Sequence, residues 1–200
     1  MAGRDGLTRE QAKQGTREAL IDAAMGAISE QGLDAPSLDA ICARAGYTRG
    51  AFYVHFKDRD DLIAAVMEKV TGVLLDALIA TGDAAMDLER SIRAFVDAVD
   101  YGMFPLRGAV APHQILQACV RSPALRGRYV ATLDEAVRRV EHAVREGQEA
   151  GTVRRDVDAR HLATMLVGIV LAVQNLSEVE YKFDIRNMAE SVLRLLRPAG

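Results

Sequence analysis

The chain has 200 residues, and half of them are apolar, which is enough to bury a substantial core. Its formal net charge is −3, so it cannot coat nucleic acid through bulk positive charge, and any affinity for DNA must come from a local cluster of cations. The N-terminal residues contain no apolar run, and the longest such run, Leu162–Val173, is shorter than a bilayer span, so we expect a cytoplasmic protein with no signal peptide and no membrane helix.

Residues 1–15 are polar, contain glycine and basic side chains, and are predicted to form a flexible arm. Such an arm beside a DNA-binding unit can touch the phosphate backbone, although a plain disordered tail is the simpler interpretation. A first helix is expected to begin at Thr16 and to end at Gly32, with an alanine-rich face that lets the following helices pack closely.

The next stretch of the chain predicts a helix-turn-helix. Apolar residues recur at helical spacing after Ser37 and again after Thr48, and both residues can cap a helix through a side-chain oxygen. Gly46 lies between the two helices and can adopt the positive φ that a tight turn requires. Phe52 and Phe56 share one helix face, where they can fill the small core made with the first helix.

The second of these short helices carries the charge that binding to DNA requires. Between Ala40 and Lys57 the chain has basic residues and no acidic one, in a protein whose overall charge is negative. Arg49 opens the helix and can bridge O6 and N7 of a guanine, so it is the candidate for reading bases. Gly50 leaves room for a close approach to the groove, and the methyl group of Ala51 can meet a thymine methyl group.

The segment from Ala45 to Leu62, A-G-Y-T-R-G-A-F-Y-V-H-F-K-D-R-D-D-L, resembles the DNA-binding signature of the TetR family of transcriptional regulators. The resemblance is strongest over Thr16–Val66, and beyond that segment it concerns only the helical layout. Cys42 stands where the family usually has alanine, and Arg59 stands where it usually has lysine.

The resemblance implies that phosphate groups are anchored by six residues, namely Ser37, Thr48, Tyr53, His55, Lys57 and Arg59. Arg44 is expected to be a charge at the rim of the interface. The complete set of candidate DNA-binding residues is therefore Ser37, Arg44, Thr48, Arg49, Gly50, Ala51, Tyr53, His55, Lys57 and Arg59.

Six further helices are predicted after the helix-turn-helix. Asp58 can cap a long fourth helix that runs to about Ala80, and the others span 84–103, 113–120, 123–150, 158–177 and 185–196. We therefore expect an all-α fold of about nine helices. Its two domains are the N-terminal arm with the helix-turn-helix DNA-binding domain, residues 1–60, and a helical effector-binding and dimerisation domain, residues 61–200.

A single helix-turn-helix reads only a few base pairs, so specific binding usually needs two half-sites about one helical turn, roughly 34 Å, apart. We therefore expect a homodimer that binds an inverted-repeat operator in double-stranded DNA. The eighth helix, 158–177, is apolar nearly all round, and with the ninth, 185–196, it is the best candidate for a four-helix dimer interface, as the family resemblance also implies. The alternative is that both helices are buried within one subunit.

The resemblance further implies that a small effector binds the larger domain and lowers its affinity for DNA, with repression as the commoner mode of regulation. The candidate wall residues mix apolar surface with a few polar groups, as ligand sites do. They are Met67, Phe95, Tyr101, Phe104, His113, Gln117, Tyr129 and Gln174. Each has an ordinary core or surface role as its alternative, and only His113 and Gln117, which share a helix face, give a sharper indication.

No enzyme site is expected. The four histidines form no HxxxH or HExxH motif, and the chain has no nucleophile elbow or phosphate-binding loop, so we expect no catalysis, no cofactor and no metal site. One alternative stays open, namely a redox- or metal-responsive regulator that uses Cys42, Cys119 or His113 in place of an organic effector. The two cysteines form no CxxC pair and are expected to be reduced thiols in the core.

Overall fold

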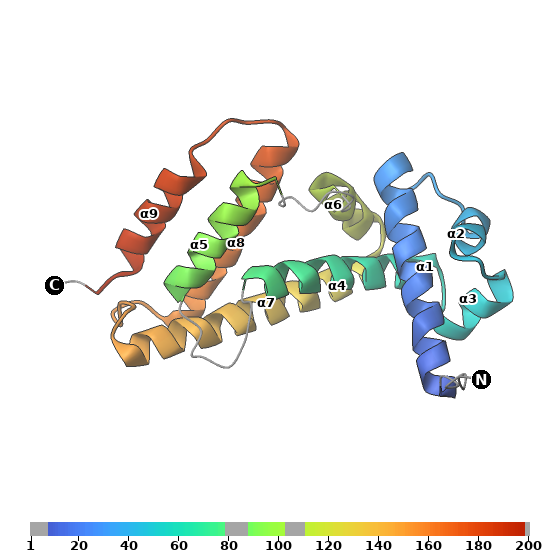
Figure 1. Ribbon diagram of the computed structural model, residues 1–200, viewed down its shortest axis with the longest axis horizontal. Helices are drawn as coiled ribbons and strands as arrows, with labels where there is room; N and C mark the ends of the chain where they lie inside the picture. The colour runs from blue at the N-terminus through green and yellow to red at the C-terminus, as the bar shows by residue number, and fades with distance from the viewer. Residues whose placement is uncertain (1–7, 79–87, 103–110, 199–200) are drawn as a thin grey trace, which may run out of the picture. The chain divides into compact units, whose positions relative to one another are not determined.

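The structure is a computed structural model that describes residues 8–78, 88–102 and 111–198, with side chains for all of these except residues 73–78. Over these residues the chain forms nine helices and no strand, which confirms the predicted all-α fold (Figure 1). The helices are α1 (Arg9–Gln31), α2 (Leu38–Ala45), α3 (Arg49–His55), α4 (Arg59–Leu78), α5 (Leu88–Asp100), α6 (Pro112–Arg121), α7 (Pro123–Ala150), α8 (Ala159–Glu178) and α9 (Ile185–Leu196).

The helices belong to two compact units. The first contains the residues up to Met67 and the segment Gly108–Arg126, and so holds α1, α2, α3, the first part of α4 and all of α6. The second contains Glu68–Arg107 and Gly127–Gly200, with α5, α8, α9 and most of α7. The division into two functional domains after residue 60 stays a prediction. The compact units are a different division, because they group α6 with the helix-turn-helix.

Helix α1 begins earlier than predicted. Thr8 Oγ1 accepts a hydrogen bond from the Gln11 amide at 3.2 Å, and the Gln11 side chain accepts one from the Thr8 amide at 2.8 Å, which completes a capping box. Thr16, the predicted cap, lies inside the helix, where its hydroxyl donates to the Ala12 carbonyl at 3.0 Å. The predicted flexible arm is therefore wrong from the capping box onward, and its residues 1–7 lie outside the described residues.

The helix-turn-helix has both predicted caps and the predicted turn. Ser37 Oγ accepts a hydrogen bond from the Ala40 amide at 3.1 Å, and Thr48 Oγ1 accepts one from the Ala51 amide at 3.2 Å. Gly46 ends α2 in the left-handed conformation, with φ 76° and ψ 24°, which a residue with a Cβ atom adopts only with strain. The local sequence thus fixes where α2 ends and where α3 begins.

A small core joins α1, α2 and α3. Phe52 and Phe56 are fully buried, as predicted, with their ring centroids 5.4 Å apart. They pack in a core to which α1 contributes Leu20 and Ile28 and α2 contributes Ile41, all of them buried. Burial of each such side chain stabilises the fold by about 1.5–3 kcal/mol. This core holds two helices that are too short to persist alone.

Two apolar clusters form the core of the second unit. One includes Val144 of α7 and Leu162 of α8, and it extends to α5 and α9. The other joins Phe95 of α5, Val173 of α8 and Ile185 of α9. Helices α5, α8 and α9 therefore share a continuous packing arrangement within this unit.

Most predicted helix bounds agree with the structure. Helices α7 and α9 span the predicted residues 123–150 and 185–196. Helix α6 begins at Pro112, one residue before the predicted start at 113. Proline fits the first turn of a helix, where its missing amide hydrogen is not needed. The predicted ends of the fifth helix, at 84 and 103, lie outside the described residues.

Helix α8 is the one helix in the described parts of the chain that is long and apolar enough to cross a membrane by length and composition alone. The core helix of a soluble protein passes the same test, and α8 supplies side chains to both clusters of its unit. Its exposed residues gather on one face, which we call the α8 stripe and which includes Thr164, Met165, Gly168 and Ala172. Within a single chain, α8 is therefore covered on one side only.

Candidate nucleic-acid interface

Helix α3 presents its first turn to solvent. The side chain of Arg49 is 57% exposed, and Tyr53, one turn later, is 55% exposed. A Cβ atom added to Gly50 would meet only Thr48 Oγ1, at 3.6 Å, so the space outside Gly50 is open. Phe52 is buried and anchors the opposite face of the helix. The predicted groove contacts thus lie together on the exposed part of α3.

Arg49 is paired with α2. Its Nε atom lies 3.4 Å from Oδ1 of Asp39, whose side chain is 69% exposed. An exposed pair of this kind contributes little to stability, so the guanidinium can exchange the carboxylate for a base or a phosphate at small cost. Asp39 therefore orients the arginine, a contact that the sequence analysis missed because Asp39 precedes the acid-free segment.

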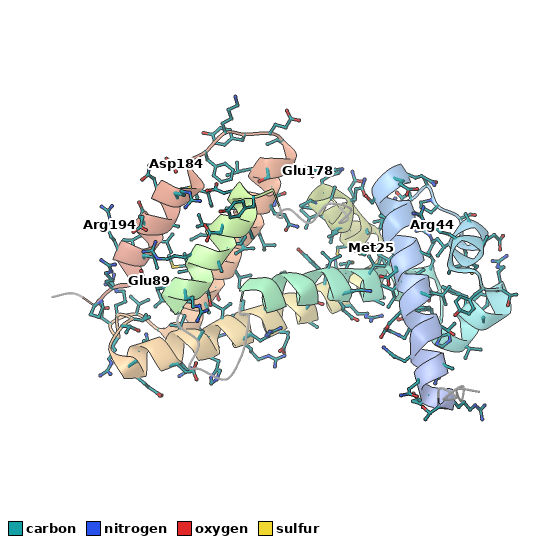
Figure 2. The ribbon with its side chains drawn as sticks, in the orientation of Figure 1. Met25, Arg44, Glu89, Glu178, Asp184 and Arg194 are labelled. Carbon is teal, nitrogen blue, oxygen red and sulfur yellow. The ribbon has the colours of Figure 1, made fainter. Side chains whose placement is uncertain are left out.

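Arg44 joins α2 to α1. Its guanidinium makes two hydrogen bonds to the carboxylate of Glu30, at 2.7 and 2.8 Å. Figure 2 labels Arg44 among the side chains of the helices. A Cβ atom on Gly26 would lie 2.7 Å from Arg44 Nη2, so the glycine leaves room for the arginine to cross α1. The hydrogen bonds from Arg44 hold the pKa of Glu30 below its usual value. The rim contact of Arg44 with DNA stays a prediction. In the structure the charge of Arg44 is paired with Glu30.

Lys57 and Arg59 lie at the junction of α3 and α4. The guanidinium of Arg59 donates a hydrogen bond to the carbonyl oxygen of Leu33, so this side chain braces the turn between α1 and α2. Lys57 is exposed, and its backbone amide donates to Asp61 Oδ2 at 3.0 Å. Asp58 caps α4, as predicted, by accepting a hydrogen bond from the Asp61 amide at 2.9 Å. Of the two basic residues, Lys57 is the better placed to meet a phosphate.

His55 lies beside cations that the sequence analysis did not select. Burial lowers the pKa of His55, and the positive charges of Lys13 and Arg17 on α1 lower it further. The guanidinium carbon of Arg17 lies 5.2 Å from the centroid of the Phe56 ring, which is a cation–π contact. Recognition of the capping box at Thr8 would have placed Lys13 on a helix and revealed this cluster.

The remaining candidates of the DNA-binding set lie around α3. The hydroxyl groups of Ser37 and Thr48 already accept backbone hydrogen bonds, and each keeps a proton to donate to a phosphate oxygen. Ala51 is half-buried, which leaves part of its methyl group accessible. Tyr47, which the sequence analysis did not assign to DNA, is 37% exposed in the turn before α3.

The described candidate effector residues are divided between the two units. The first unit holds Met67, His113 and Gln117, the second holds Phe95, Tyr101, Tyr129 and Gln174, and Phe104 lies outside the described residues. Tyr101, His113 and Gln117 are exposed, whereas Met67, Phe95 and Gln174 are buried. Gln174 is the one buried polar side chain in the described part of the chain, so it is the strongest polar candidate.

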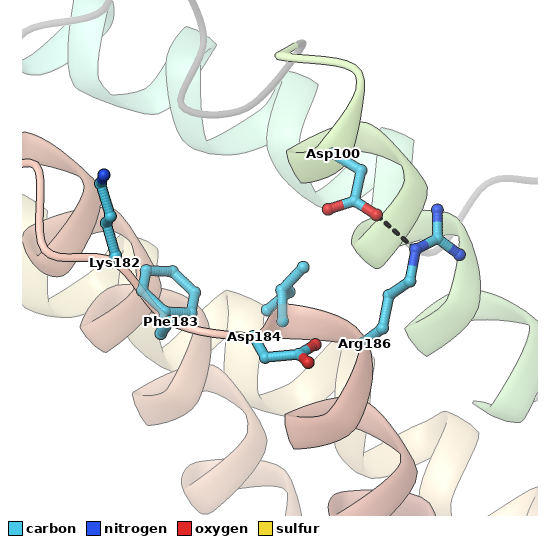
Figure 3. Close-up of a pocket in the computed structure, with 6 residues that line it drawn as sticks. Asp100, Lys182, Phe183, Asp184 and Arg186 are labelled. Atoms are coloured by element: carbon cyan, nitrogen blue, oxygen red, sulfur yellow. Dashed lines mark ion pairs between the residues drawn. The ribbon is translucent and has the colours of Figure 1, made fainter.

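A hollow of about 530 Å³ lies in the second unit where α5 ends and α9 begins (Figure 3). It is lined by Asp100, Lys182, Phe183, Asp184, Ile185 and Arg186. Arg186 pairs with Asp100 at 2.5 Å, so its charge is already neutralised. None of the candidate effector residues that the structure describes lines this hollow.

The cysteine and metal alternatives gain no support. Cys42 and Cys119 are buried free thiols, and burial raises the pKa of each, which lowers the fraction of reactive thiolate. The described residues contain no group of three or more His, Cys, Asp or Glu side chains that could hold a metal ion.

Two family models match the chain. Residues 20–66 match the model described as bacterial regulatory proteins, tetR family. Residues 116–191 match the model described as tetracyclin repressor-like, C-terminal domain. The first match contains the whole helix-turn-helix, and the second contains all of α7 and α8.

Curated relatives match over different lengths. The HTH-type transcriptional regulator SrpR of Pseudomonas putida is 28% identical over 156 residues, which cover 78% of this chain and 71% of SrpR. The HTH-type transcriptional regulator AcrR of Shigella flexneri is 43% identical over 61 residues, which cover 30% of this chain and only 28% of the length of AcrR. The stronger identity is thus confined to less than a third of this chain.

Among solved structures, SmeT, the repressor of the Stenotrophomonas maltophilia multidrug efflux pump SmeDEF, has a TM-score of 0.63 and 29% identity, with 90% of this chain and 88% of SmeT covered. A SmeT–triclosan complex has a TM-score of 0.69 and 28% identity, with 91% of this chain and 90% of SmeT covered. The capped helix-turn-helix, the matches to both family models and the shared fold agree, and the chain therefore belongs to the TetR family of bacterial regulatory proteins.

Proposed function

We propose that this protein is a cytoplasmic, homodimeric transcriptional repressor that binds an inverted-repeat operator through α3 and is released by a small organic effector. The observation that carries the proposal is the exposed first turn of α3. Thr48 caps that turn, Gly50 keeps it open, and Arg49 projects from it and pairs with an exposed carboxylate. A cation on an open helix end is what guanine recognition in a major groove requires.

The α8 stripe supports a dimer. It places small residues, Gly168 and Ala172, beside the 60% exposed side chain of Met165. Small residues let two helices approach closely, and an exposed apolar side chain gains stability when a second copy covers it. Two copies then present two α3 helices to two half-sites, which raises both affinity and specificity.

The proposed effector is a small organic molecule with a mainly apolar surface and at least one hydrogen-bonding group. Phe95 and Gln174 of the second unit support this class, because they are a buried aromatic and a buried amide from the candidate set. SmeT, which is 28% identical to this chain, forms a complex with triclosan, a small organic compound. The buried thiols make the redox alternative the weaker one.

The roles of Arg49 and Lys57 can be separated by competition binding at several salt concentrations. The operator is first selected from random duplexes with the wild-type protein. Arg49→Ala is expected to lower the preference for this operator over random DNA by about 1–3 kcal/mol. Lys57→Ala is expected to weaken binding to both duplexes equally and to reduce the slope of log affinity against log salt by about one. Identical behaviour of the two variants would contradict the assigned roles.

A further inference from the structure

The turn that joins α8 to α9 has a fixed backbone. Glu180 adopts φ 53°, in the left-handed region that residues with a Cβ atom seldom occupy. The next amide, that of Tyr181, donates a hydrogen bond to the Leu176 carbonyl at 2.9 Å, which closes the end of α8. The chain therefore enters the segment Lys182–Arg186, which lines the hollow, in a direction that the backbone sets.

The hollow where α5 ends and α9 begins has an apolar floor. Phe183 is half-buried and Ile185 is 7% exposed, and both pack in the cluster that contains Phe95 and Val173. Its volume of about 530 Å³ lies within the range of small-molecule sites. A ligand with an apolar body can therefore cover the part of the Phe183 ring that the chain itself leaves uncovered.

The carboxylates of the lining have partners within the protein (Figure 3). Asp184 accepts hydrogen bonds from the amide and the side-chain nitrogen of Asn187, at 3.0 and 2.6 Å. Asp100 lies 2.5 Å from Nε of Arg186, and Asp97 lies 3.4 Å from Nη2 of the same guanidinium. The two acids and the arginine of the lining are therefore engaged with other residues of the chain.

Lys182 differs from its neighbours in the lining. Its side chain is exposed and makes no ion pair and no hydrogen bond within residues 8–78, 88–102 and 111–198. An ammonium group offers three donors and no acceptor. The open polar group of the hollow is therefore one cation beside an apolar floor, which complements one negative charge on an apolar body.

We propose that this hollow is a second small-molecule site, which binds a small aromatic carboxylate with its charge on Lys182 and its ring against Phe183. Aromatic rings pair in offset or edge-to-face arrangements, so the half-buried ring favours an aromatic body. The inference goes beyond the proposed function, because the lining contains no candidate DNA-binding or effector residue that the structure describes. Asp100 ends α5 and the other lining residues lie at the start of α9, so a bound acid would hold these two helices together.

Nuclear magnetic resonance of the ¹⁵N-labelled full-length protein, titrated with 1-naphthoate, tests the site. The backbone amides of Lys182 and Phe183 are expected to shift in a saturable way, with a dissociation constant on the order of 1 mM for a ligand of this size. The neutral isostere 1-naphthamide is expected to bind about three- to fivefold more weakly, as loss of one exposed ion pair implies. Inorganic phosphate, which has no apolar body, is expected to leave these amides unshifted.

Three variants separate the two parts of the site. Lys182→Gln is expected to bind the acid and the amide equally, because the cation that distinguishes them is gone. Arg194→Gln removes another exposed cation, in the last turn of α9, and as the matched control it is expected to keep the preference for the acid. Phe183→Leu keeps an apolar side chain and removes the ring, so it is expected to bind both compounds about two- to fivefold more weakly.

Four results would overturn the site. They are no saturable shift at Lys182 and Phe183 up to about 10 mM naphthoate, the largest shifts elsewhere in the chain, a preference for the acid that survives Lys182→Gln, and the same shifts with phosphate alone. The titration contains no DNA, so failure to select an operator would overturn the proposed function and leave this test unaffected.

Discussion

Helices α3 and α8 each leave one face exposed, but the two faces differ in chemistry. The face of α3 carries Arg49 and Tyr53, whose large polar ends reach outward. The α8 stripe carries Gly168, Ala172 and Met165, which are small or apolar. The first face suits hydrogen bonding to a charged polymer, and the second suits close packing against a similar helix. In the proposed function, one chain thus separates contact with DNA from contact with its own copy.

The largest expected effect follows from removing the support of α3. Phe52→Ala deletes a fully buried ring, which we expect to lower the free energy of unfolding by about 3–5 kcal/mol. DNA binding should be lost while dimerisation through the α8 stripe persists, because Phe52 lies in the first unit. Chemical denaturation, operator binding and sedimentation of the same preparation check this. A variant that binds DNA as tightly as the wild type would show that the position of α3 does not depend on this core.

The converse change breaks the dimer and leaves α3 intact. A Cβ atom at Gly168 meets no described atom within 4 Å, so Gly168→Glu fits a single chain but places a charge in the α8 stripe. We expect monomers in light scattering and at least a hundredfold loss of operator affinity, because one half-site contact is lost. Gly127→Glu is the matched control, since Gly127 also lies on a helix with open space around it. Dimers of the Gly168 variant would exclude the stripe as the interface.

A smaller effect, a gain in DNA affinity, is expected from a change beside α3. Asp39→Asn removes the carboxylate that pairs with Arg49 and that the proposed binding mode would bring near the phosphates. We expect all duplexes to bind about two- to fivefold more tightly, as loss of one weak, exposed ion pair implies. Fluorescence anisotropy with the operator and with random DNA measures the change. Weaker binding of the operator alone would mean that Asp39 mainly orients Arg49 for base reading.

The smallest effect concerns pH. The pKa of His55 is lowered by burial and by Lys13 and Arg17, so the free protein holds this residue neutral near pH 7. A nearby phosphate offsets those cations and raises the pKa, so DNA binding takes up a proton and strengthens as pH falls below about 6.5. We expect a two- to threefold gain in affinity between pH 7.5 and 6 that disappears in His55→Gln. A wild-type affinity that is flat over this range would remove His55 from the phosphate contacts.

The sequence predicted the helix-turn-helix well because its signals are local. The caps at Ser37 and Thr48 and the turn at Gly46 each act within a few residues, and the structure contains all three. The start of α1 was missed because Gly15 and several polar residues outweighed a capping box that was not noticed.

The partners of the basic residues could not be predicted from the sequence. Arg44 with Glu30 and Arg59 with Leu33 join positions that only the tertiary fold brings together. The effector pocket could not be predicted from the sequence for the same reason. A pocket is formed by side chains from several helices. Periodicity shows which residues turn inward but not which of them contact one another.

The most direct test of the account is selection of duplexes from a random library by the full-length protein, with the mass of the complex measured in solution. The account predicts an enriched inverted repeat whose half-sites are centred about one helical turn apart, or a multiple of it, and at least two chains on each duplex. A single chain that enriches no inverted repeat over random DNA would contradict it.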